Sequence, residues 1–164
     1  MQSIKLGRTF IMAAALGLFP ALALAADKPT ADEAKKVIDY YYHGKGLSPV
    51  LVETRICHDI QHDGDDKNEC AGDVTGQPIK KGDSDYVWMA FMAPNGSDAQ
   101  PVIVQLELNG AVRWVRNISV SGGLRTRTWL KHTFDKPGAW KLKISLDTGT
   151  SVTPLGTMDL NVQE

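Results

Sequence analysis

The sequence predicts a mainly β fold: an antiparallel immunoglobulin-like β-sandwich of about seven strands with one N-terminal helix. Runs of residues alternate between apolar and polar positions with period two, and they recur roughly every ten residues. Gly, Pro, Asn and Asp separate these runs, as turns require. Only one stretch, near the N-terminus, has helical spacing. A small β-barrel would show the same pattern and is the alternative fold.

The first 25 residues are expected to be a signal peptide. Lys5 and Arg8 give a basic start, residues 10–24 are apolar, and a small-x-small cleavage site ends at Ala25. The apolar run is shorter than the ~20 residues of a membrane span, so no transmembrane helix should be retained. Cleavage near Ala25 and Ala26 would release a periplasmic or secreted protein.

Residues 26–164 are expected to form a single domain. The whole chain has a net charge of −1, and cleavage would remove two further positive charges. A generic nucleic-acid binder is basic, so nucleic acid is not an expected partner.

Two cysteines, Cys57 and Cys70, are the only ones in the chain. In an exported protein they are expected to form a disulfide, which would stabilise the fold by about 3 kcal/mol through loop closure. The loop 57–70 that it closes is rich in acidic residues and poor in apolar ones. We therefore expect this loop to be exposed.

The single helix is predicted over residues 31–43. Thr30 and Glu33 have the spacing of a capping box, in which each side chain binds the backbone amide of the other residue. Apolar residues follow at helical spacing, and Gly44 or Gly46 is expected to end the helix.

The first strand is predicted over residues 49–57, with one face formed by Val50, Val52, Thr54 and Ile56. Residues 85–93 are apolar on both faces. This predicts a central strand that is covered by the second sheet on one side and by the helix or a loop on the other.

Asn109-Gly110 predicts a tight hairpin between residues 102–108 and 112–120. Arg116 interrupts the apolar face of the second strand, which indicates either a bulge or a burial boundary. The last strand, after a turn at 147–150, should point Met158, Leu160 and Val162 inward.

Residues 124–134 and 139–146 are predicted to form a hairpin around the Pro137-Gly138 turn. Each run has one apolar and one basic face. Arg113 would join the basic face if the preceding strand pairs alongside. The hairpin itself would place on one sheet surface Arg125, Arg127, Trp129, Lys131, Lys141 and Lys143.

This basic face is the candidate ligand-binding site. Arginine suits bidentate contacts with carboxylate, sulfate or phosphate, and Trp129 offers a stacking platform. The matching partners are an anionic glycan, a lipid headgroup or a partner protein in the envelope. Two other interpretations stay open: the basic residues are ordinary exposed charges that guard against edge pairing, or the acidic loop folds over them and neutralises them.

Arg127-Thr128-Trp129 followed by Pro137-Gly138-Ala139-Trp140 resembles a pattern of small bacterial exported β-sandwich domains of uncharacterised function. The resemblance covers residues 105–163. It implies the sandwich fold, and it brings no catalytic residues.

A metal site is the alternative binding function. His58 and His62 lie four residues apart in the acidic loop, beside Asp59 and Asp63. Imidazole with carboxylate suits zinc or copper. A solvated acidic loop held by a disulfide explains the same residues, so we expect no metal and no other cofactor.

The common catalytic motifs are absent from the sequence. It has no Gly-x-Ser-x-Gly elbow, no zincin helix, no phosphate-binding loop and no dinucleotide fingerprint. This leans against an enzyme and leaves the question open. The sequence therefore favours an exported non-catalytic binding or accessory domain, with a metal-binding domain or a purely structural envelope protein as alternatives.

Overall fold

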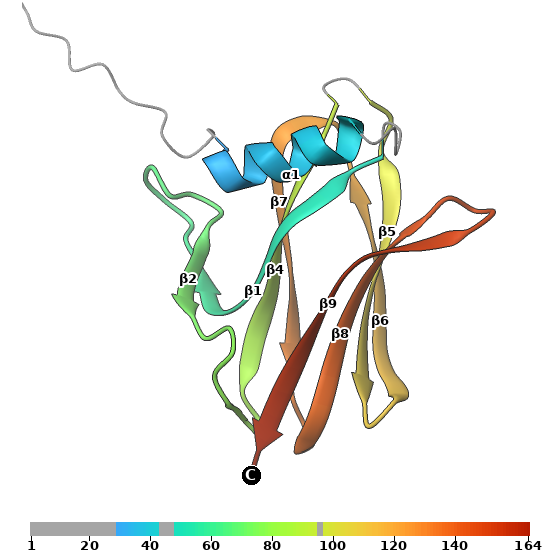
Figure 1. Ribbon diagram of the computed structural model, residues 1–164. Helices are drawn as coiled ribbons and strands as arrows, with labels where there is room; N and C mark the ends of the chain where they lie inside the picture. The colour runs from blue at the N-terminus through green and yellow to red at the C-terminus, as the bar shows by residue number, and fades with distance from the viewer. Residues whose placement is uncertain (1–28, 43–47, 95–96) are drawn as a thin grey trace, which may run out of the picture.

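The computed structural model describes residues 29–42, 48–94 and 97–164, which form one helix and nine strands. Two sheets pack face to face as a sandwich (Figure 1). The prediction of a mainly β sandwich with one N-terminal helix is confirmed, and the barrel alternative is wrong. The expected signal peptide and the helix stop at Gly44 or Gly46 lie outside the described residues. Within the described part of the chain, no helix is long and apolar enough to cross a membrane.

One sheet has four strands in the order β2-β1-β4-β7, and all neighbours are antiparallel. It consists of β1 (Val50–Ile60), β2 (Cys70–Asp73), β4 (Ser84–Ala93) and β7 (Gly123–Thr133).

The other sheet has five strands in the order β3-β9-β8-β5-β6, with one parallel pair, β3 and β9. It consists of β3 (Ile79–Lys80), β5 (Gln100–Leu108), β6 (Ala111–Val120), β8 (Gly138–Asp147) and β9 (Val152–Gln163). The short strands β2 and β3 raise the number above the predicted seven.

The inner core fills the space between the two sheets. The four-stranded sheet contributes residues such as Ile56, Val87 and Phe91, and the five-stranded sheet contributes residues such as Leu106 and Leu142, all fully buried. Leu160 and Val162 of the last strand are buried here as predicted, and Met158, which is partly buried, packs against this core.

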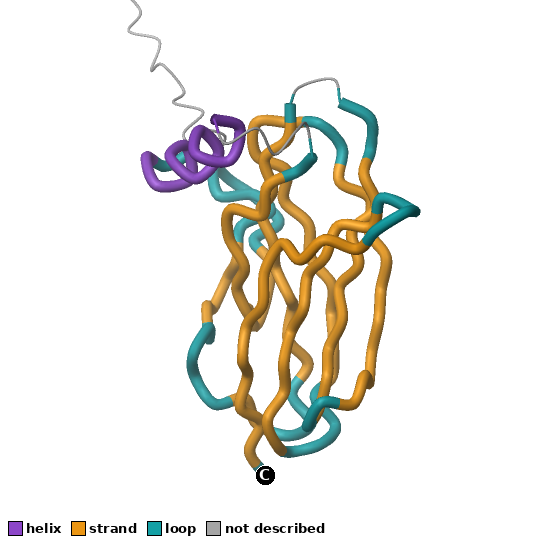
Figure 2. The backbone as a smooth tube through the Cα atoms, turned by 45° about the vertical axis from the view of Figure 1, so that its right-hand side comes forward, coloured by secondary structure: helices purple, strands orange, loops and turns teal. Residues whose placement is uncertain are grey.

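An outer core covers the far face of the four-stranded sheet. Trp88 and Ala90 of β4 lie in it, and helix α1 (Ala31–Tyr42) contributes Val37. Figure 2 shows the helix across one end of the sandwich, with the C-terminus at the other end. The Trp88 indole N–H donates to the carbonyl of Asn68 in the disulfide loop at 2.8 Å. The predicted central strand, covered by a sheet on one side and by helix and loop on the other, is therefore confirmed for β4.

The helix begins with the predicted capping box. The Thr30 amide donates to Glu33 Oε2 at 2.8 Å, and the Glu33 amide donates to Thr30 Oγ1 at 3.2 Å. These two bonds satisfy backbone donors that the first turn would otherwise leave without partners.

A β-bulge in β1 corrects the predicted first strand. The pairing with β4 shifts between Leu51 and Glu53, which adds one residue to β1 and reverses the direction of its side chains. Val50 and Val52 therefore belong to the outer core, whereas Ile56 belongs to the inner core. The prediction that these side chains share one face is wrong.

The predicted hairpin over residues 124–146 is also wrong. Strand β7 pairs with β4, and β8 pairs with β5 and β9, so the two runs belong to opposite sheets. The Phe134 ring is buried where the chain crosses between them, and its backbone bonds Gly82 and Asp83. In a strand without a bulge, an alternating pattern predicts which side chains share a face, but it does not predict which strand pairs with it.

The Asn109-Gly110 hairpin between β5 and β6 is confirmed, with φ angles of 51° and 81°. The β5–β6 register shifts at Leu106 and Glu107, opposite residues 112–114. Arg116 lies beyond this bulge, on the exposed edge strand, with its guanidinium 5.1 Å from the Trp114 ring centroid. Of the two interpretations of Arg116, the strand does contain a bulge, but the bulge lies at residues 112–114 and not at Arg116 itself, which is exposed between the partly buried Trp114 and Ile118.

Candidate functional site

The residues of the predicted basic face lie on two different sheets. Arg125, Arg127, Trp129 and Lys131 belong to β7 of the four-stranded sheet. Lys141 and Lys143 of β8, and Arg113 of β6, belong to the five-stranded sheet. The single basic surface drawn across a hairpin therefore does not exist.

Arg125 is held by the chain's own carboxylates. Its side chain is only 10% exposed, and Nε donates to Glu33 Oε1 at 2.9 Å. It also contacts Glu69 of the disulfide loop and, at 3.4 Å, Glu53 of β1. Burial alone would lower the pKa of Arg125, but hydrogen bonds and charge from Glu33 and Glu69 outweigh burial and raise it. Arg125 is therefore a fixed, compensated charge.

Arg125 belongs to a group of charged residues, the arginine cluster, which comprises Glu33, Glu53, Glu69, Arg125 and Arg127. Arg127 Nε donates to the same Glu69 carboxylate that binds Arg125. The guanidinium groups of Arg55 and Arg125 lie 5.7 Å and 5.5 Å from the centroid of the Trp88 ring. The acidic loop thus folds over this part of the face and neutralises it, which was one of the open interpretations.

The other residues of the predicted face are more exposed. The Lys131 ammonium lies 5.2 Å from the centroid of the Tyr86 ring, beside a half-buried Trp129. On the other sheet, Lys143 binds Glu107 at 2.6 Å and Lys141 approaches Asp159 at 3.3 Å. Arg113 is exposed in the β6 bulge.

The expected disulfide between Cys57 and Cys70 is present, with a Cα–Cα distance of 5.6 Å. Residues 61–67 are exposed as expected, but residues 57–60 continue β1, and there the expectation is wrong because Ile60 is buried in the outer core. Cys70 follows Glu69 directly in the chain, so the bridge anchors the loop segment that carries this carboxylate of the arginine cluster.

The histidines of the metal alternative are not brought together with the acidic residues around them. His58 Nδ1 bonds Asp85 Oδ1 at 2.8 Å, whereas His62 and Asp63 lie in the exposed loop. Asp59 accepts a hydrogen bond from the neighbouring Ile60 amide. Among the described residues, no group of three or more His, Cys, Asp or Glu side chains could hold a metal ion.

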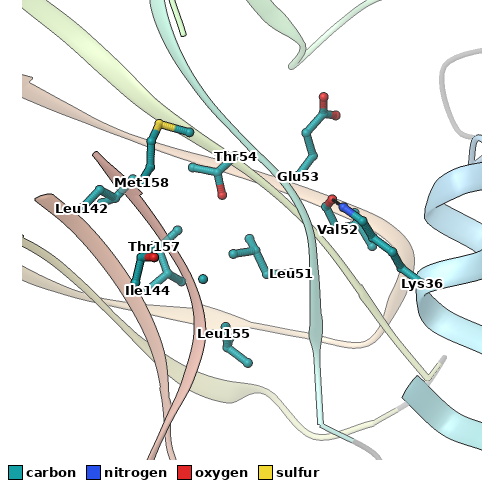
Figure 3. Close-up of a pocket in the computed structure, with 11 residues that line it drawn as sticks. Lys36, Leu51, Val52, Glu53, Thr54, Leu142, Ile144, Leu155, Thr157 and Met158 are labelled. Atoms are coloured by element: carbon teal, nitrogen blue, oxygen red, sulfur yellow. Dashed lines mark hydrogen bonds between the residues drawn. The ribbon is translucent and has the colours of Figure 1, made fainter. Parts of the chain in front are cut away.

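The sandwich is open along one seam, between β1 and β9. Strand β2 pairs with β1 only over residues 57–60, and β3 pairs with β9 only at Val162 and Gln163. The first half of each strand therefore has no strand neighbour on the side that faces the seam. A pocket of about 380 Å³, the seam pocket, lies there (Figure 3).

The walls of the seam pocket come from both sheets. Leu51 and Thr54 extend from β1 toward β9, from which Leu155 and Met158 approach (Figure 3). The floor consists of Leu142 and Ile144, whose side chains belong to the inner core.

Two bulges keep the strands apart. One is the bulge at Leu51 and Glu53, and the other adds Leu155 to β9 between Pro154 and Gly156. Where the strands do approach, at Gly156, a Cβ atom would lie only 2.7 Å from Leu51 Cδ2. A side chain larger than that of glycine at this position would therefore require the Leu51 side chain to shift.

Lys36 of α1 lies at the rim of the seam pocket. Its ammonium donates to the Val52 carbonyl at 2.7 Å, and Val52 is the extra residue of the β1 bulge. Among the described residues, Lys36 forms no ion pair with a carboxylate. Glu53 also lines the pocket, but Arg55 and Arg125 bind its carboxylate. The rim therefore has one uncompensated positive charge.

The sequence patterns did not predict this pocket. Pro154 and Gly156 in the middle of the last predicted strand were the available signal, because both residues mark strand edges and bulges. Nothing in the sequence indicated that Lys36 would reach β1.

No family profile matches the chain, and no curated protein matches it. Among solved structures, the C-terminal domain of Wzt is similar, with 15% identity and a TM-score of 0.50 over 73% of this chain and 75% of that one.

A CARDB domain from Pyrococcus furiosus is similar at TM-scores of 0.37 and 0.39. Its crystal structure, in complex with di-metal ions, has 14% identity over 52% of this chain and 78% of that one. Its solution NMR structure has 15% identity over 71% and 97%. The likeness to Wzt extends to the sandwich fold and not to function.

Proposed function

We propose that this chain is an exported, non-catalytic binding domain of the bacterial envelope that takes a small ligand in the seam pocket. The observation that carries the proposal is the pocket itself. Its volume of about 380 Å³ falls within the range of about 300–1,000 Å³ that small-molecule sites occupy.

The chemistry of the lining supports binding. Ligand pockets combine an apolar surface with a few polar groups that orient the ligand. Here the aliphatic walls are accompanied by the Thr54 and Thr157 side chains and by the Lys36 ammonium. These groups can fix the orientation of a ligand without reacting with it.

Export is part of the proposal. The basic start and apolar run of residues 1–25 have the composition of a signal peptide. The Cys57–Cys70 disulfide supports it, because such bridges persist in oxidising compartments. We therefore propose a periplasmic or secreted location.

We place the ligand in the seam pocket and not on the basic face that the sequence predicted. We keep the prediction that the ligand is an anion. Arg125 and Arg127 are occupied by Glu33 and Glu69. The uncompensated charge at a concave site is that of Lys36.

A methyl NMR titration tests the proposal. The purified protein, labelled at methionine and leucine methyl groups, is titrated separately with anionic glycans, alkyl carboxylates, alkyl phosphates and uncharged alcohols. We expect at least one class to produce saturable shifts at the Met158 and Leu51 methyl groups.

The variants Leu155→Trp and Val152→Trp form a matched pair. Leu155 lines the pocket, whereas Val152 is on the same strand and 59% exposed outside it. Leu155→Trp should fill the pocket and abolish the shifts, and Val152→Trp should leave them unchanged. Binding that is equal in both variants, or a panel that shifts no pocket methyl group, contradicts the proposal.

A further inference from the structure

We infer, building on the proposed binding function, that the ligand of the seam pocket is an anionic amphiphile. Its aliphatic chain enters between β1 and β9, and its carboxylate or phosphate head group binds Lys36.

Part of the pocket lining suits an aliphatic chain. Apolar side chains from both sheets lie there beside the polar groups of Glu53, Thr54 and Thr157, and they are Leu51, Leu142, Ile144, Leu155 and Met158. Removing methylene groups from water against such a surface is favourable roughly in proportion to the area covered. Met158 is flexible and polarizable, so it can adapt to a chain of variable conformation.

The floor of the pocket leads to the centre of the sandwich. Leu142 and Ile144 are at most 1% exposed and pack in the inner core, while Leu51, Leu155 and Met158 are only partly buried. A chain that enters the seam would therefore complete the burial of three partly exposed apolar side chains. That gain is available to an alkyl chain and not to a hydroxyl-covered ligand.

The rim of the pocket suits an anion. An ammonium group has three donors, and the Val52 carbonyl accepts one of the Lys36 donors at 2.7 Å. The neighbouring carboxylate of Glu53 does not compete, because Arg55 and Arg125 bind it. Two donors of Lys36 remain for a carboxylate or phosphate oxygen.

An extended peptide fits the same seam less well. A peptide would add itself to the unpaired edge of β9 through regular backbone hydrogen bonds. Pro154 has no N–H, and the bulge at Leu155 interrupts the regular pattern on this edge. Both features are known to block strand addition, and neither hinders a chain that has no backbone donors.

The test uses four probes that separate the chain from the head group: dodecanoate, dodecyl phosphate, dodecanol and butyrate, each below its micelle-forming concentration. The Met158 methyl signal, assigned with Met158→Leu, reports on the pocket. We expect saturable shifts with dodecanoate or dodecyl phosphate and at least tenfold weaker binding of butyrate. The two dodecyl anions together show whether the site prefers a carboxylate or a phosphate.

Lys36→Gln tests the head-group contact, with Lys35→Gln as its control on the same helix. Both side chains are exposed, but only Lys36 lines the pocket. We expect Lys36→Gln to weaken binding of the dodecyl anions about tenfold and to leave dodecanol unchanged, whereas Lys35→Gln should change neither.

Four outcomes would overturn the inference, and they separate it from the proposed function. Equal affinity for dodecanol and dodecanoate, unaffected by Lys36→Gln, would retain a binding pocket and refute anion recognition. Pocket shifts with an anionic glycan but not with dodecyl compounds would retain the proposed function and refute the amphiphile. Shifts that persist in Leu155→Trp, or their absence with every compound, would refute both.

Discussion

The four-stranded sheet holds positive charge in two different ways. On its outer face, Arg125 of β7 is bound by Glu33 of the helix and Glu69 of the disulfide loop, and Arg127 of β7 is bound by Glu69. Beside β1 of the same sheet, Lys36 binds a single backbone carbonyl at the rim of an open pocket. In the first arrangement, carboxylates of the same chain neutralise the arginines. In the second, the Lys36 ammonium has no carboxylate partner among the described residues. A cluster of cations in a sequence is therefore a poor guide to a binding site, because the sequence does not show which of these cations are bound by carboxylates of the same chain.

The largest expected effect is the loss of Arg125. Arg125→Ala leaves Glu33, Glu53 and Glu69 together without their common partner. Removing one member of a buried ion pair typically costs 3–5 kcal/mol, so we expect the free energy of unfolding to fall by about that much. Urea denaturation monitored by tryptophan fluorescence measures it.

Lys141→Ala is the matched control for Arg125→Ala. The Lys141–Asp159 pair is exposed, and such pairs contribute about 0–1 kcal/mol. If both substitutions lower the free energy of unfolding by the same amount, the arginine cluster does not stabilise the outer core.

The next effect comes from the disulfide. Cys57→Ala combined with Cys70→Ala releases the loop that carries Glu69 and the Asn68 carbonyl bound by Trp88. We expect the free energy of unfolding to fall by about 3 kcal/mol. We also expect a red shift of tryptophan fluorescence, because water reaches Trp88. An unchanged emission spectrum in the folded variant would show that the helix alone shields this ring.

A smaller, pH-dependent effect is expected from His132. Its ring packs against Trp114, Phe134 and Trp140 between the sheets. Burial lowers its pKa from the ordinary value of 6.5; Asp135 opposes this shift and Arg116 adds to it. Because the folded state holds the proton less tightly, the stability linked to His132 is complete above pH 6.5 and declines as the pH falls below it.

His132→Phe should remove this pH dependence of stability in urea denaturation between pH 7.5 and pH 5. A His132→Phe variant that keeps the full decline above pH 5 would assign the effect to another group.

Glu33 affects stability at lower pH than His132 does. Burial opposes its ionisation, but hydrogen bonds from Thr30 and Arg125 prevail and lower its pKa below 4.5, so its contribution to stability is lost only below that pH.

The smallest expected effect is that of Lys36→Gln on stability. Lys36 is exposed and donates one hydrogen bond, so the free energy of unfolding should change by about 0.5 kcal/mol or less. A loss comparable with that of Arg125→Ala would mean that Lys36 serves the fold and not a ligand.

Local patterns made much of the fold predictable. The Thr30–Glu33 capping box, the Asn109-Gly110 turn and the central position of β4 each depend on residues close together in the sequence, and the structure confirms all three. The disulfide was predictable because the chain has only two cysteines.

The candidate site was not predictable because it depends on distant partners. Arg125 meets Glu33 across 92 positions, and Lys36 reaches Val52 across 16. The bulge in β1 moves Val52 to the other face, and alternation cannot locate such an insertion. The Pro137-Gly138 turn fits a crossing between sheets as well as it fits a hairpin, so the basic face was assembled from strands that do not pair.

A crystal structure of the protein with dodecanoate tests the central claim most directly. We predict continuous density for the chain between β1 and β9, with the carboxylate within hydrogen-bond distance of Lys36 Nζ. Density on another surface, with Leu51 and Leu155 closed against each other across an empty seam, would contradict the account.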